Sequence, residues 1–365
     1  MMRITGRNRD LWVVLAAVIL MVACGSEGRS PKRPDLPSGG VSGQGETNLR
    51  RMVWIPGGTF RMGDQDDLGR ADESPAHTVT VSGFWMDATE VTNREFREFV
   101  NATGYRTTAE QVPNWEEMKR DLPPDVEKPP EELLVPASLV FVRPTEEDST
   151  SDPSVWWQWT PGASWQCPEG PGSSLVGRED HPVVHVSHDD AVAYARWARK
   201  RLPTEAEWEF AARGGQAGSS YPWGSDVDSD DAPKANIWQG RFPMMNLVRD
   251  GYSGTSPVKS FAPNSFGLYD MAGNVWEWCS DWYDSTHYGA RAGSSVINPQ
   301  GSSRSYDPEE PTIRKRVVRG GSFLCHRDYC TGYRVSARMR TAPDTGLSHT
   351  GFRCVADAPP PRSGR

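Results

Sequence analysis

The sequence predicts a single α+β domain with little regular secondary structure, and three observations support this prediction. A chain of 365 residues can bury a substantial core without a disulfide or a metal ion. Its 35 glycines and 30 prolines interrupt regular elements, whereas its 15 tryptophans supply apolar groups for collapse. Short strand and helix patterns alternate in the first part of the domain, and no internal repeat or second domain boundary is evident.

The N-terminal segment has the pattern of an export signal. Three arginines precede an apolar stretch at 11–22, which is shorter than the about 20 residues of a transmembrane helix. Met21-Val22-Ala23-Cys24 resembles the bacterial lipobox. We therefore expect a signal peptide at 1–23, lipidation of Cys24, and an extracytoplasmic, membrane-anchored lipoprotein. Ordinary cleaved secretion with an incidental cysteine is the alternative.

The rest of the chain divides into three parts. Residues 24–50 are polar and rich in glycine, serine and proline, as expected of a flexible tether. The globular domain is expected at 51–358, followed by a short tail at 359–365. The net charge of −8 gives no support for nucleic-acid binding, and we expect a monomer without a nucleic-acid partner.

Local patterns predict the first elements of the domain. Apolar alternation predicts strands at Met52–Ile55 and His77–Val81. Thr92 is a favourable N-cap for a helix at 93–102, which Gly104 ends.

The middle of the chain is less regular. Residues 120–160 are rich in proline and acidic residues and predict a long surface excursion. A strand at 183–186 is expected to lead into a helix at 189–199. Thr204 and Glu207 form a capping box for a second helix, and beyond Gly214 helical periodicity is scarce.

Two cysteines form the strongest candidate site. Cys325 and Cys330 lie five residues apart in a glycine-led loop. Such a pair can form a structural disulfide, bind a soft metal ion or act as a redox pair. The neighbouring His326 and Arg327 favour thiolate, because positive charge lowers the pKa of a thiol. Two thiolates suit Cu(I) and leave room for a third thiolate from a substrate.

The number of cysteines supports a free thiol. Without Cys24 the chain keeps five cysteines, the pair above together with Cys167, Cys279 and Cys354. Because an exported chain tends to oxidise its thiols in pairs, an odd number leaves at least one thiol free or bonded to another chain.

The sequence resembles the formylglycine-generating enzymes, also called sulfatase-modifying factors. The shared motifs lie at Trp54–Gly58, Asp87–Asn93, His181–Ser187, Lys200–Glu209, Asn236–Gly240, Gly273–Trp278 and Gly351–Cys354. The Cys-His-Arg-Asp-Tyr-Cys segment is more specific, since it marks the catalytic subgroup of this family. The resemblance implies the sulfatase-modifying-factor fold, which is related to C-type lectins.

The resemblance also implies an oxidoreductase. Its substrate would be an unfolded sulfatase polypeptide with a Cys-x-Pro-x-Arg motif, whose cysteine is converted to Cα-formylglycine. Cys325 and Cys330 would hold Cu(I), and the reaction would consume O2 and a thiol reductant.

Further site residues follow from the same resemblance. Ser322 would stand beside the catalytic cysteines, and Trp276 would line the site. The substrate groove would include Glu90, His326, Arg327 and Tyr329. His349 departs from the family, which usually has an asparagine there. Because histidine also donates or accepts a hydrogen bond, we expect tuned rather than lost activity.

Two oxygen-rich groups match the calcium sites of the family, and Ca2+ prefers hard oxygen ligands. The first group is Asn236, Ile237, Asp250 and Tyr252, and the second is Asp270, Gly273, Val275 and Glu277. Tyr252 and Asp270 stand where the family has phenylalanine and asparagine. The residues alone leave ordinary surface turns as the alternative, whereas the resemblance favours structural Ca2+.

Other cysteine and histidine positions are interpreted as structural or left open. Ala195, Ala212 and Val335 replace three of the four cysteines that form disulfides in vertebrate relatives, so Cys354 lacks its usual partner. Whether Cys354, Cys167 and Cys279 form a disulfide stays open. His181 and His185 would share one face of a strand while His188 points away, which argues against a metal site.

Two other functions of the superfamily compete with the oxidase. One is a non-haem iron enzyme similar to sulfoxide synthases, which needs a histidine cluster. The other is a non-catalytic, lectin-like binding module. The cysteine pair argues against both.

Overall fold

The computed structural model describes residues 49–119, 127–145, 155–226, 232–357 and 359. The expectations for the export signal, for Cys24 and for most of the tether and tail lie outside the described residues. The strands are β1 (Met52–Ile55), β2 (Gly58–Met62), β3 (His77–Val81), β4 (Phe84–Asp87), β5 (Ala137–Phe141), β6 (Trp157–Pro161), β7 (Gly240–Arg241), β8 (Met245–Asn246), β9 (Trp276–Trp282), β10 (Ser295–Ile297), β11 (Arg316–Arg319), β12 (Arg338–Thr341), β13 (Thr350–Gly351) and β14 (Val355–Ala356). The helices are α2 (Asn93–Thr103), α3 (Trp115–Met118), α4 (His188–Trp197) and α5 (Glu205–Arg213).

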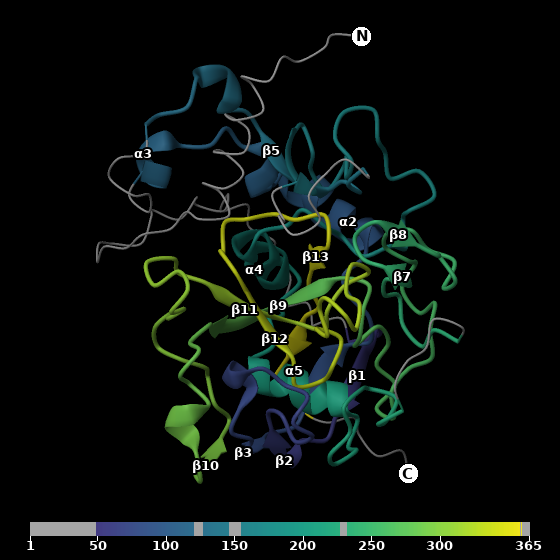
Figure 1. Ribbon diagram of the computed structural model, residues 1–365, viewed down its shortest axis with the longest axis vertical. Coiled ribbons are helices and arrows are strands. Elements are labelled where there is room, and N and C mark those ends of the chain that lie inside the picture. Colours follow the sequence, from purple (N-terminus) through teal and green to yellow (C-terminus); the bar gives the residue numbers. More distant parts are fainter. Residues whose placement is uncertain (1–48, 120–126, 146–154, 227–231, 358, 360–365) are drawn as a thin grey trace.

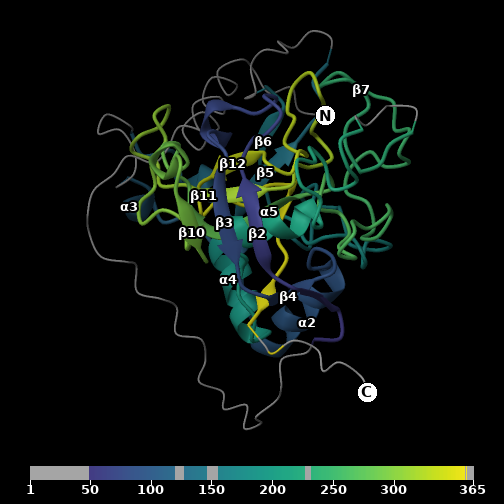
Figure 2. The same cartoon turned by 90° about the horizontal axis from the view of Figure 1, so that it is seen from below.

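The strands form small sheets, as expected for an α+β domain of low regularity. A four-stranded sheet of order β12-β11-β9-β13 lies at the centre, and β13 pairs in parallel with β9. Two three-stranded sheets have the orders β1-β4-β14 and β10-β3-β2. Helix α5 contacts β9 and β11 on one side and β2 and β3 on the other (Figures 1 and 2).

The helices with local capping signals form where the sequence predicts them. Helix α2 begins after Thr92, whose side chain accepts from the backbone N–H of Glu95, and ends at Gly104 with a φ of 68°. Thr204 caps α5 in the same way. Helix α4 begins one residue earlier than predicted, because Ser187 and Asp190 form a further capping box, and it ends at Trp197 rather than 199.

Two predictions about the middle of the chain are wrong. Residues 183–186 form no regular strand, because Val183 and His185 bond separately to Val91 and Leu347 instead of to one partner strand. The segment 120–160 is not only a surface excursion. Its strand β5 is largely buried and pairs with β6, which carries Trp157 and Trp159. Proline and acidic residues around β5 conceal it in the sequence.

Buried ion pairs tie α5 to the central sheet. The Glu205 carboxylate on α5 accepts from Arg338 Nε at 2.7 Å, from Arg338 Nη2 at 2.8 Å and from Arg319 Nη1 at 3.0 Å. Arg319 also donates to Glu209 at 2.6 Å. All four side chains are buried, so each charge depends on its partners for solvation.

In the part of the chain that the structure describes, the core includes two large apolar clusters and a small one. The large clusters lie around α2 with α4 and around α5 with β2 and β3. The small cluster is built on Trp238, Phe323 and Leu324. Among the described residues, no helix has the length and apolar character that crossing a bilayer requires.

Candidate functional site

Cys325 and Cys330 lie side by side at the end of the loop that follows β11. Their sulfur atoms are 2.7 Å apart, and both cysteines are free thiols. The loop therefore presents two neighbouring thiols. Cys325 is buried, whereas Cys330 is half-buried. Two adjacent thiols are the donor set that a soft ion such as Cu(I) prefers, so the residues present fit this metal.

The two thiols differ in acidity. Burial raises the pKa of Cys325 well above its ordinary value, and the neighbouring Cys330 adds to this effect. The hydrogen bond from Cys325 lowers the pKa of Cys330, and the charges of Arg70 and Arg334 act in the same direction. The positive charge beside Cys330 therefore comes from these two arginines. The sequence-based argument named His326 and Arg327 and did not identify Arg70 and Arg334.

Backbone hydrogen bonds fix the loop that carries Cys325. The carbonyl of Cys325 accepts from the N–H of Trp238 at 2.9 Å, and the N–H of Phe323 donates to the carbonyl of Asn274 at 3.0 Å. The N–H of Gly273 donates to Gly320 at 2.8 Å. The dithiol loop is therefore attached to irregular segments around 238 and 273–274.

Glycines allow the close packing around Cys330. A Cβ atom at Gly332 would lie 2.5 Å from Trp276 Cζ2 and 3.1 Å from Cys330 Sγ. A Cβ atom at Gly321, where φ is +73°, would lie 2.7 Å from the backbone nitrogen of Tyr333. The ring of Trp276 thus lies against Gly332, two residues after Cys330.

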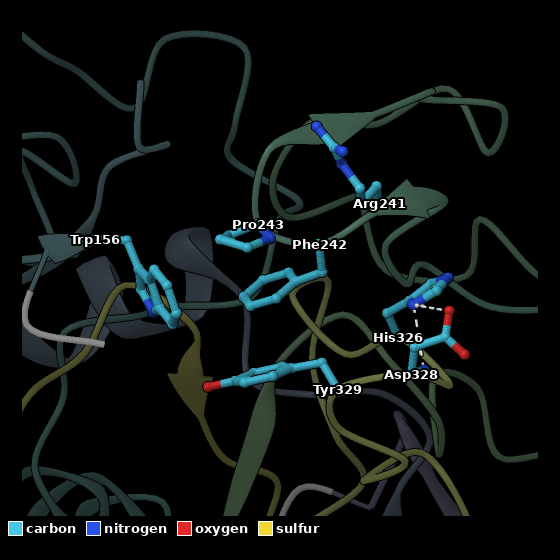
Figure 3. Close-up of a pocket in the computed structure, with 7 residues that line it drawn as sticks. All are labelled: Trp156, Arg241, Phe242, Pro243, His326, Asp328 and Tyr329. Carbon is cyan, nitrogen blue, oxygen red and sulfur yellow. Dashed lines mark hydrogen bonds and ion pairs between the residues drawn. The ribbon is translucent and has the colours of Figure 1, made fainter. Parts of the chain in front are cut away.

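A cavity of about 150 Å3 opens beside the dithiol loop. Its lining residues, shown in Figure 3, are Trp156, Arg241, Phe242, Pro243, His326, Asp328 and Tyr329. The last three belong to the turn between the two cysteines. The cavity therefore borders the turn that connects Cys325 and Cys330, while the cysteines themselves are not among its lining residues.

Aromatic side chains form the wall of this cavity. The ring of Phe242 stacks on Tyr329 with centroids 4.2 Å apart, and Trp156 packs edge-on against both rings. Tyr329 is 54% exposed although it is aromatic. Such a wall offers flat apolar surfaces to an extended peptide. Sequence reasoning missed Trp156, Arg241 and Phe242, because they come from segments far from the cysteines.

The other residues predicted around the pair take different places. His326 is buried and lines the cavity, with Nδ1 3.3 Å from the Asp328 N–H that donates to it. Ser322 is fully buried and its carbonyl accepts from the N–H of Cys325 at 2.9 Å, so it shapes the turn that leads into this cysteine. Arg327 is exposed and does not line the cavity.

His349 lies beside Trp276 but outside the cavity lining. Its carbonyl accepts from the N–H of Trp276 at 2.9 Å, and its ring packs edge-on against Trp157 at 4.7 Å. Burial, and then the nearby His185, lowers the pKa of His349 to about 3. The ring is therefore neutral near pH 7 and links β13 to the aromatic β6.

Glu90 does not lie in an exposed groove, in contrast to the prediction that it contacts the substrate. This side chain has no exposed surface. Its Oε1 accepts from Asn274 Nδ2 at 3.1 Å, and its Oε2 has no hydrogen-bond partner among the described residues. Burial, and then the charge of Asp270, raises the pKa of Glu90 well above its ordinary value. Glu90 belongs to the interior beside the second oxygen-rich group.

The first oxygen-rich group is brought together by the fold. The carbonyl of Ile237 and Oδ2 of Asp250 both face the side-chain amide of Gln239. Asp250 Oδ1 accepts from the N–H of Tyr252 at 2.9 Å, and Asn236 Oδ1 is buried without a hydrogen-bond donor within the described part of the chain. The group thus offers one unsatisfied amide oxygen together with a carbonyl and a carboxylate oxygen, which are the oxygen types that Ca2+ prefers.

In the second oxygen-rich group, one of the expected calcium ligands, Glu277, is already bonded to an arginine. Asp270 has a φ of 56° and Oδ2 accepts from the N–H of Lys259 at 2.8 Å. Burial raises the pKa of Asp270 to about 6. Glu277 is bonded to Arg353 Nε and Nη2, both at 2.7 Å. Asp270 offers a carboxylate of the kind that Ca2+ prefers, whereas Glu277 is the partner of a buried arginine.

The histidine segment is structural. His181 contacts the Thr255 hydroxyl, and His185 bonds to Ser138 and to the carbonyl of Pro168 at 2.8 Å each. Across the described ranges, no three histidine, cysteine, aspartate or glutamate side chains are grouped to hold a metal ion. Cys167, Cys279 and Cys354 are free thiols, so no two of them form a disulfide here.

Comparisons with known proteins show which family this chain resembles. The family model for the sulfatase-modifying factor enzyme 1-like domain matches residues 38–358. The chain is 48% identical over 308 residues to a formylglycine-generating enzyme of Thermomonospora curvata, covering 84% of this chain and 93% of that protein. For a formylglycine-generating enzyme of Streptomyces coelicolor, the identity is 46% over 314 residues, with 85% and 90% covered.

Two further similarities limit what the comparisons imply. A Mus musculus protein named inactive C-alpha-formylglycine-generating enzyme 2 is 40% identical over 315 residues, covering 85% of this chain and 87% of that protein. The solved structure of PvdO from Pseudomonas aeruginosa matches with a TM-score of 0.53 and 27% identity, covering 84% of this chain and 94% of that one. Proteins named formylglycine-generating enzyme and a protein named inactive are thus both similar to this chain.

Proposed function

The chain belongs to the sulfatase-modifying factor enzyme family, and we propose that it converts a cysteine in unfolded sulfatase polypeptides to Cα-formylglycine. Family membership alone does not carry this proposal, because one similar protein is named inactive. The observation that carries it is the dithiol. Two free thiols lie next to each other, and the turn between them lines an aromatic cavity.

Each part of the site has a role in the proposed reaction. Cys325 and Cys330 would hold Cu(I), which supplies the O2-activating chemistry when bound. The aromatic wall of Trp156, Phe242 and Tyr329 orients an extended substrate segment, so that its cysteine approaches the dithiol. A thiol reductant provides the remaining reducing equivalents. The protein itself contributes orientation and a partly enclosed site.

The test is an assay on a synthetic peptide with a Cys-x-Pro-x-Arg motif. Purified protein supplied with Cu(I), O2 and a thiol reductant is expected to lower the peptide mass by the difference between thiol and aldehyde. Mass spectrometry measures this change, and an aldehyde-specific probe confirms it. Omitting Cu(I) or O2 is expected to stop the reaction. An unchanged peptide under complete conditions would refute the oxidase proposal.

We also propose that both oxygen-rich groups bind Ca2+. Support comes from the unsatisfied Asn236 Oδ1 and from the cluster of oxygens around Asp250 and Asp270. Chelation of Ca2+ is expected to lower the melting temperature. Re-addition at about 100 times Kd should restore about 2.7 kcal/mol per site, because only the folded chain forms these sites.

Calorimetry with matched Mg2+ additions checks this proposal. Mg2+ should restore less stability than Ca2+, because it demands a smaller and more regular set of ligands. Identical melting temperatures with chelator, Ca2+ and Mg2+ would show that neither group is a calcium site.

A further inference from the structure

Asn274 stands where the two oxygen-rich groups meet the dithiol loop. It lies just before β9, is 1% exposed and has a φ of 57°, in the left-handed region. Asparagine tolerates this conformation better than most residues, but a buried left-handed asparagine still requires its surroundings to hold it.

The side chain of Asn274 joins three segments. Its Nδ2 donates to Glu90 Oε1 at 3.1 Å, while its Oδ1 accepts from the N–H of Ser256 at 2.9 Å and from Asn236 Nδ2 at 3.2 Å. Asn236 belongs to the first oxygen-rich group, and Glu90 lies beside Asp270 of the second. One buried amide therefore connects both groups.

The main chain of Asn274 continues the connection to the cysteines. Its N–H donates to the carbonyl of Asn236 at 2.8 Å, and its carbonyl accepts from the N–H of Phe323 at 3.0 Å. Phe323 is two residues before Cys325. Because the side-chain contacts fix the backbone of Asn274, they also fix the direction of the carbonyl that holds the cysteine loop.

We propose that Asn274 is a positioning residue that sets the geometry of the Cys325–Cys330 pair. This inference rests on the proposed function for its kinetic consequence, but not for its structural one. Asn274 contacts neither the cavity nor the sulfur atoms in the structure. It acts through Phe323 and the turn that follows.

Glycine is the informative substitution at this position. Asn274→Gly keeps the left-handed backbone without strain and removes only the amide, whereas Asn274→Asp would place a carboxylate against Glu90. Asn298→Gly is the matched control. Asn298 is also left-handed, with a φ of 45°, but it is exposed and bonds to Ser82 away from the cysteines.

The expected result is a change in the dithiol with little change in peptide binding. For Asn274→Gly we expect kcat and Cu(I) affinity to fall at least about tenfold, because small displacements of reacting groups cost this much. KM for the peptide should stay within about twofold, since the cavity is untouched. Asn298→Gly should match the parent protein in every measurement.

Two measurements make the test decisive. Competition with a chromophoric Cu(I) chelator and the alkylation rate of Cys330 report on the dithiol without turnover, so they remain informative if the parent protein proves not to oxidise the peptide. Asn274→Gly protein with parental Cu(I) affinity and alkylation rate would overturn the inference. The inference would also be overturned if the losses of kcat and Cu(I) affinity only matched the fraction of unfolded Asn274→Gly protein, as measured by thermal unfolding.

Discussion

Serine at either Cys325 or Cys330 is expected to abolish aldehyde formation, with a loss on the order of 10³-fold or more, because each thiol belongs to one functional unit. The hydroxyl of serine is a poor ligand for a soft ion, so removing one sulfur leaves only one suitable donor. The two sulfur atoms lie 2.7 Å apart, so each thiol is placed to act together with the other. The peptide assay measures the activity.

Cys279→Ser is the matched control for this experiment. Cys279 is as buried as Cys325 but lies within β9, and its thiol has no part in the proposed chemistry. A buried serine costs roughly 1–3 kcal/mol if its hydroxyl is left unsatisfied, so Cys279→Ser and Cys325→Ser should lose similar stability. Only Cys325→Ser and Cys330→Ser should lose activity. Retained activity in a folded Cys330→Ser protein would exclude the dithiol mechanism.

The second large effect is expected at Glu205. Replacing Glu205 with glutamine removes the charge that partners Arg338 and shares Arg319. Breaking such a buried pair costs about 3–5 kcal/mol, because the remaining guanidinium loses solvation that water cannot restore. Thermal unfolding should shift down by roughly 5–10 °C in a domain of this size.

An exposed ion pair provides the comparison for Glu205→Gln. Glu169 pairs with Arg178, and both side chains are largely exposed. Glu169→Gln should therefore change the free energy of unfolding by less than about 1 kcal/mol. Equal effects of the two substitutions would contradict the importance assigned to the buried network.

The same network gives a pH dependence with a definite sign. Burial alone would raise the pKa of Glu205, but Arg338 and Arg319 outweigh it and hold the pKa below its ordinary value. A lowered carboxyl pKa stabilises the fold above the unfolded-state pKa, and this contribution is lost as pH falls through the folded-state pKa. The Glu205→Gln protein should therefore lose less stability on acidification than the parent protein.

Local signals in the sequence account for the elements that were predicted well. The starts of α2 and α5 could be predicted from the capping boxes formed by Thr92 with Glu95 and by Thr204 with Glu207, because a capping box involves only neighbouring residues. Strand β5 was missed, since its burial depends on the pairing with β6 and on packing against distant residues.

Within the candidate site, the residues of the segment from Cys325 to Cys330 could be predicted from the sequence. The spacing of Cys325 and Cys330 identifies the pair, and the turn between them supplies His326 and Tyr329 to the cavity. The burial of Glu90 was not predictable, because it arises from contacts with residues about 180 positions later, such as Asn274. The effect of Arg70 on Cys330 has the same non-local origin.

The backbone bonds around the dithiol loop determine how the site opens. The amide hydrogens of Phe323 and Trp238 bond to carbonyls across the loop, outside any sheet. Their exchange with solvent requires the loop to detach from its neighbours, so exchange rates at these amides measure a local opening free energy. That opening draws on the irregular segments rather than on the central sheet. Cys325 also packs in the same apolar cluster as Trp278 and Val318 of the central sheet, so comparing these exchange rates with those of β9 and β11 measures how strongly the loop is coupled to the core.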